Sequence, residues 1–134
     1  MNSQLEDILC QRYPKIYAER QASKGASSMA WGIMCGDGWF DLLDALCSSL
    51  QFQTDRCGAP QVVASQIKEK FGVLSFHRRD ASETQRGMIA MAEAMSTRIC
   101  EKCGKPGRIL AVDSLRQTLC TEHAPDCARP LGAD

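Results

Sequence analysis

The chain has 134 residues, of which 44% are hydrophobic and 24% are charged, as in an average soluble globular protein. Its 16 basic and 16 acidic residues give a formal net charge of zero, so the basic excess usual in nucleic-acid binders is missing. No apolar run approaches the roughly 20 residues that cross a bilayer, and residues 1–10 do not resemble a secretory signal. Eight cysteines in such a chain indicate a reducing compartment, where thiols stay free or hold metal.

The N-terminal third predicts a short helix followed by a polar connection. Ser3-Gln-Leu-Glu6 has the form of a capping box, in which hydroxyl and carboxylate satisfy each other's free backbone amides. Pro14 should end or kink this helix. Residues 22–28 are small and polar, and we expect a flexible connection there.

The strongest helical pattern of the N-terminal half follows Gly36-Asp-Gly-Trp39. Apolar side chains recur at the helical period from Trp39 to Leu50, and we expect the helix to end near residues 52–54. Asp37 is placed to cap it. The two glycines are also compatible with an anion-binding loop, but they lack the longer spacing and the lysine of a nucleotide-binding loop.

The middle of the chain contains a segment of ambiguous secondary structure, then a predicted strand and a long predicted helix. Residues 62–71 fit a short helix capped by Gly72, with a strand as the alternative because β-branched residues favour it. Residues 73–77 predict a strand. Ser82, helped by Gln85, should cap a long helix that leads straight to the first metal ligand. The predicted buried face of that helix consists of Met88, Ile89, Ala92, Met95 and Ile99.

Two ligand pairs near the C-terminus have the spacing of a structural zinc site. Cys100 and Cys103, like Cys120 and His123, are separated by two residues, and 16 residues lie between the pairs. Thiolates are soft ligands that suit zinc, which prefers four ligands in a tetrahedron. Three thiolates and one imidazole close the site, so we expect one structural Zn²⁺ that supplies folding energy rather than catalysis.

The residues between the two pairs predict a small β-hairpin. Residues 109–112 and 115–119 read as two short strands, so knuckle, hairpin and second pair follow the order of a treble-clef or zinc-ribbon module. Cys127 is the alternative fourth ligand to His123. Ordinary buried cysteines with a surface histidine are the alternative to a metal site.

Several residues outside the ligand pairs have both a functional and a purely structural interpretation. Cys35 lies before a helix start, where the pKa of a thiol can fall, but its only candidate base is His77, and we favour a structural role. We favour a core position for Trp39, whereas Trp31 would be a plausible interface anchor if exposed. The stretch 68–86 is mildly basic, and scattered acids favour a solvated face over a phosphate contact; its cations are Lys68, Lys70, Arg78, Arg79 and Arg86.

Four segments occur in an order that resembles a group of small zinc-binding proteins encoded by tailed bacteriophages and prophages. They are Gly36-Asp-Gly-Trp-Phe-Asp-Leu-Leu-Asp-Ala-Leu-Cys47, Ile67-Lys-Glu-Lys-Phe-Gly-Val-Leu-Ser-Phe76, residues 100–107, and Leu119-Cys-Thr-Glu-His-Ala124. The resemblance covers roughly residues 30–125, and Ser75 and His77 depart from the aromatic strand usual in the group. It implies no catalytic residue, but it implies a phage accessory protein that acts in the bacterial host cytoplasm.

The sequence therefore predicts an α+β protein that is mainly helical, with a body over residues 1–99 and a zinc module over residues 100–134 packed on the last long helix. The expected function is non-enzymatic binding and modulation of a host protein, of which a defence component is one class. Nucleic-acid binding through the zinc module and residues 68–86 is the first alternative, and a thiol-dependent enzyme using Cys35 is the second. Methionine-rich helix faces also suit a homodimer.

Overall fold

The structure is a computed structural model that describes residues 1–131. The helices are α1 (Ser3–Arg12), α2 (Phe40–Cys57) and α3 (Glu83–Ser96), with 3-10 turns η1 (Ser28–Trp31) and η2 (Asp37–Trp39). The strands are β1 (Ile33–Met34), β2 (Ala64–Lys70), β3 (Val73–Arg78), β4 (Arg108–Val112), β5 (Leu115–Leu119) and β6 (Arg129–Pro130). The fold is α+β as predicted, and its 37% helix and 22% strand do not confirm a mainly helical chain. No helix within residues 1–131 has the length and apolar character of a membrane span.

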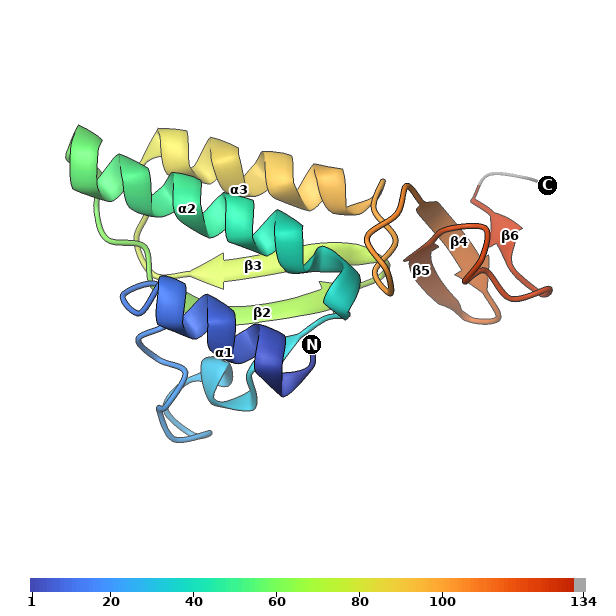
Figure 1. Ribbon diagram of the computed structural model, residues 1–134, viewed down its shortest axis with the longest axis horizontal. Helices are drawn as coiled ribbons and strands as arrows, with labels where there is room; N and C mark the ends of the chain where they lie inside the picture. The colour runs from blue at the N-terminus through green and yellow to red at the C-terminus, as the bar shows by residue number, and fades with distance from the viewer. Residues whose placement is uncertain (132–134) are drawn as a thin grey trace.

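The body is a three-stranded sheet with helices packed on one face. The strand order is β1-β2-β3, with β1 parallel and β3 antiparallel to β2. Ile67 pairs with Ile33 on one side and with Phe76 on the other, and all three side chains are buried. Helices α2 and α3 run side by side over these strands (Figure 1), and Trp39 is fully buried in the same core, as predicted.

The outer edge of β3 is covered by side chains of α3. Leu74 donates its backbone N–H to Ser96 Oγ at 2.8 Å, and Phe76 donates to Glu93 Oε2 at 3.0 Å. An uncovered strand edge would present these donors to another chain. Helix α3 therefore both buries the sheet and closes its edge.

The helix predicted over residues 62–71 is wrong, and the strand alternative is right. Residues 64–70 form β2, and Phe71 and Gly72 make the turn into β3. The apolar positions fit a helix, but pairing with β1 and β3 satisfies the backbone, and Ile67 is the β-branched residue within the strand. Phe71 is exposed at the hairpin tip.

Helix α3 begins as predicted, with the reciprocal capping box of Ser82 and Gln85. Of the predicted buried face, Ile89 and Ala92 are buried, Met88 and Ile99 are partly buried, and Met95 is exposed. The polar side chains of Gln85 and Ser96 are buried as well. The helix ends at Ser96, so a turn rather than continuous helix leads to Cys100.

The predicted caps of the other two helices are wrong. Asn2, not Ser3, caps α1, and Glu6 instead pairs with Arg20 in a partly buried ion pair. Asp37 does not cap α2, because its carboxylate accepts from the backbone and side-chain nitrogens of Asn2. Helix α2 also runs beyond residues 52–54, to a left-handed Gly58.

The C-terminal module is a second small sheet at one end of the body (Figure 1). Strand β4 pairs antiparallel with both β5 and β6, so the predicted hairpin is present with nearly the predicted bounds. Its buried cluster consists of only Cys100, Leu110, Leu119 and Cys120. A core of this size is small for a module that must hold its own shape.

Candidate metal centre

The first ligand pair lies in a tight turn directly after α3. Cys100 donates its N–H to the Lys105 carbonyl at 2.7 Å, and Gly104 donates its N–H to the Cys100 carbonyl at 2.9 Å. Gly104 has a φ of +80°, a conformation that costs glycine little. The turn places the side chains of Cys100 and Cys103 on the same side.

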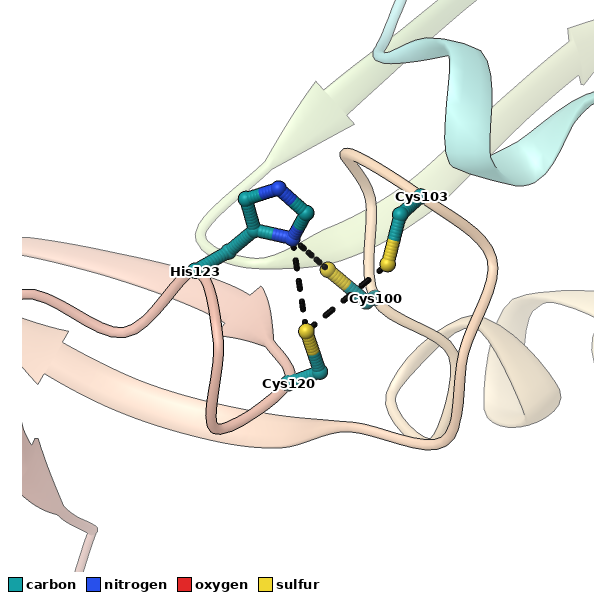
Figure 2. A group of neighbouring side chains, drawn as sticks. All are labelled: Cys100, Cys103, Cys120 and His123. Atoms are coloured by element: carbon teal, nitrogen blue, oxygen red, sulfur yellow. Dashed lines mark hydrogen bonds between the residues drawn. The ribbon is translucent and has the colours of Figure 1, made fainter.

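The second pair lies where β5 ends. The N–H groups of His123 and Ala124 both donate to the Cys120 carbonyl, at 3.2 and 2.9 Å, and so close a turn. This turn directs Cys120 and His123 toward the first pair. Figure 2 shows the four side chains converging from the two turns.

The distances between the four ligand atoms fit a tetrahedron around one ion. All four atoms lie within 4.8 Å of one another. The Sγ atoms of Cys103 and Cys120 are 3.7 Å apart, and His123 Nδ1 lies 3.3 Å from Cys120 Sγ and 3.7 Å from Cys100 Sγ. A tetrahedron with metal–sulfur bonds of about 2.3 Å and a metal–nitrogen bond of about 2.0 Å has edges of about 3.8 Å and 3.5 Å.

The electrostatics of the cluster also favour a cation. Burial opposes ionisation of Cys100, but backbone N–H groups of Cys120, Cys103 and Lys102 lower its pKa to about 6. The Lys105 N–H favours the Cys103 thiolate as well, yet desolvation and the neighbouring thiols outweigh it and raise the pKa of Cys103. Neighbouring thiols therefore resist ionising together unless a positive charge lies between them.

The turn that carries Cys100 and Cys103, called the knuckle below, packs against the glycine turn that precedes α2. Gly38 donates its N–H to the Glu101 carbonyl at 2.7 Å, and Trp39 Nε1 donates to the Ile99 carbonyl at 2.9 Å. A Cβ atom at Gly36 would lie 2.3 Å from the Glu101 carbonyl oxygen, and one at Gly38 would lie 2.1 Å from that of Cys100. The Gly36-Asp-Gly-Trp39 segment therefore packs directly against the turn that carries Cys100 and Cys103. The sequence alone gives no sign of this role.

Comparison of the chain with protein-family models, with curated proteins and with solved structures found no match. The geometry thus has to identify the site by itself. The four predicted side chains come together as a cluster that fits one metal ion.

Thr118 connects the C-terminal module to the β2–β3 hairpin through a buried hydrogen bond. Its hydroxyl donates to the Gly72 carbonyl at 2.6 Å, and its carbonyl accepts from the Glu101 N–H at 3.0 Å. The side chain is fully buried. The sequence offered no signal for this contact, because threonine is common in strands.

Thr118→Val is expected to destabilise the metal-loaded protein by about 1–3 kcal/mol, because it leaves the buried Gly72 carbonyl without its donor. Thr97→Val is the matched control, since it removes an exposed hydrogen bond to the Ala94 carbonyl. Urea unfolding of both variants measures the difference. Equal midpoints would show that the interhairpin bond contributes nothing.

The remaining candidate residues lie outside the cluster. Cys127 is exposed and is not among the grouped ligands of the described chain. Burial raises the pKa of Cys35 to about 12, opposite to the lowering considered from its position before a helix. His77 is exposed on β3, and no hydrogen bond within residues 1–131 joins it to Cys35.

Proposed function

We propose that this chain is a non-enzymatic binding protein whose C-terminal module folds around one structural zinc ion. The observation that carries the metal assignment is the tetrahedral spacing of three sulfur atoms and one imidazole nitrogen. Thiolate-rich tetrahedral sites favour zinc among the common divalent metals. Because four protein ligands fill the coordination shell, the ion has no position for a reactive water, and its role is to hold the fold.

Native mass spectrometry of the purified protein is expected to show one zinc ion per chain. Cys103→Ser should reduce this occupancy strongly, because it removes one of four ligands. Cys127→Ser is the matched control, since Cys127 is an exposed thiol outside the cluster. Loss of zinc from the Cys127 variant and not from the Cys103 variant would contradict the ligand set.

We further propose that the protein is a phage or prophage accessory that binds a bacterial host protein in the host cytoplasm. The motif order that resembles phage proteins supports the setting. An exposed apolar groove of about 440 Å³ between α2 and α3 supports protein binding. It is lined by Leu42, Ala45, Leu46, Ser49, Gly87, Met88, Met91, Ala92 and Met95.

The groove defines the chemistry of the partner. Its lining contains no charged side chain, and Met91 and Met95 are 65% and 40% exposed. Flexible methionine side chains adapt to apolar surfaces, and a groove between two helices suits the apolar face of a third. We therefore expect an amphipathic helix of the host protein to occupy it.

A tagged pull-down from bacterial lysate, with nuclease, tests this proposal. The wild type is expected to retain one stoichiometric host protein that Met91→Glu loses. Phe52→Glu, which alters another exposed apolar residue of α2 outside the groove, should retain it. A protein retained equally by both variants would overturn the groove assignment. A wild-type dimer that Met91→Glu converts to a monomer would also overturn it, because the groove would then be filled by a second copy.

A further inference from the structure

We propose that the face of the β1-β2-β3 sheet opposite α2 and α3, with the hairpin tip at Phe71, binds single-stranded nucleic acid. This surface is distinct from the α2–α3 groove proposed for the host protein. Three features point to it: the distribution of charge on the sheet, a cleft between two hairpins and a strained exposed aromatic residue.

The register of the sheet segregates positive charge on its outer face. Ile33, Ile67 and Phe76 form one buried row, so their neighbours along the strands point to the opposite face. By the same alternation, the outward residues are Met34, Gln66, Lys68, Lys70, Val73, Ser75 and His77. No acid is among them, although the whole chain has a net charge of zero.

A cleft of about 720 Å³ extends this face between the β2–β3 and β4–β5 hairpins. Lys68 and Lys70 line one side, and Arg116 lines the other. The acid in the lining is Glu69, whose carboxylate accepts the Gly72 N–H at 2.6 Å and is thereby engaged. The cleft is therefore complementary to an anionic ligand.

Phe71 occupies a backbone conformation that bulky residues avoid. Its φ is +55° and that of Gly72 is +85°, which is the pattern of a two-residue hairpin turn that favours Asn-Gly. The ring gains little from burial, because Phe71 is 69% exposed. Strain without a gain in packing points to a function for the side chain itself.

The aromatic and basic groups match the alternation of base and phosphate in a single strand. Lys70 Nζ lies 5.9 Å from the centroid of the Phe71 ring. Near the opposite end of the sheet, Lys24 Nζ lies 4.0 Å from the ring of Trp31, which is 58% exposed. Bases stack on such rings regardless of sequence, while lysines bind the backbone. An acidic peptide would satisfy the lysines but would leave both ring faces without a flat partner.

Fluorescence anisotropy with a labelled oligo(dT) of about 20 nucleotides, longer than a single site, tests the proposal on the zinc-loaded chain. Phe71→Asn is expected to weaken binding by about tenfold, because one stacking platform is lost. The same variant should raise the thermal midpoint by about 2–4 °C, because asparagine relieves the turn. Phe52→Asn, which alters an exposed ring outside the cleft, should leave the affinity unchanged.

The salt dependence supplies an independent readout. Lys70→Gln should lower the slope of log affinity against log salt by about 0.7, the value for one phosphate contact on a single strand. Lys15→Gln, a cation outside the cleft, should not change it.

The proposal is overturned if wild-type protein fails to bind oligo(dT), or if Phe71→Asn binds as well as wild type. Equal competition by polyglutamate would also overturn it, because that result would show an anion site without base stacking. None of these results bears on the host-protein proposal, which the α2–α3 groove variants test separately.

Discussion

Chelation of the metal ion is expected to unfold the β4-β5-β6 module while α2, α3 and the first sheet stay folded. The module has only four buried residues in its own cluster, two of which, Cys100 and Cys120, are proposed metal ligands. Zinc contributes on the order of 10–16 kcal/mol to the folding of zinc-finger peptides, far more than such a core supplies. The body has a separate core around Trp39, Leu43 and Ile67.

Amide hydrogen exchange, measured with and without a chelator, checks this expectation residue by residue. Protection of the β4 and β5 amides should collapse on chelation, and that of α3 should persist. Cys120→Ser should reproduce the chelated pattern, whereas Cys127→Ser should behave as wild type. Persistent protection of β4 and β5 in Cys120→Ser would show that the module does not need the ion.

Gly38→Ala is expected to destabilise the protein by about 3 kcal/mol, the upper range for an overpacked interior. The new Cβ would lie 2.1 Å from the Cys100 carbonyl oxygen, and this backbone atom cannot rotate away. To relieve this clash, the turn that carries Cys100 and Cys103 must move away from Gly38. That movement would break the 2.7 Å hydrogen bond from the Gly38 N–H to the Glu101 carbonyl.

Gly87→Ala is the matched control for this substitution. Gly87 lies within α3, and a Cβ there would meet nothing within 4 Å. Alanine should stabilise the helix by about 0.5–1 kcal/mol. Chemical unfolding of both variants gives the two free energies of unfolding. A Gly38 variant as stable as wild type would contradict the docking of the knuckle on the glycine turn.

The features that could be predicted from the sequence depend on residues close together in the chain. The spacing within each ligand pair is set by a local turn, so Cys100, Cys103, Cys120 and His123 could be grouped before any fold was known. The capping box of Ser82 and Gln85 is likewise a local signal, and the structure confirms it.

The features that escaped prediction depend on contacts between distant segments. Residues 64–70 became a strand because they pair with β1 and β3, and an apolar pattern alone does not report such pairing. Gly36 and Gly38 are needed because residues about 60 positions later lie against them. Glu6 has a position that suits a local cap, but its carboxylate is engaged by Arg20.

The central claim, a closed zinc site built from Cys100, Cys103, Cys120 and His123, is tested most directly by X-ray absorption spectroscopy at the zinc edge of the purified protein. We predict three sulfur ligands at about 2.3 Å and one nitrogen ligand at about 2.0 Å. A shell that contains a water oxygen, or fewer than three sulfur atoms, would contradict the closed structural site.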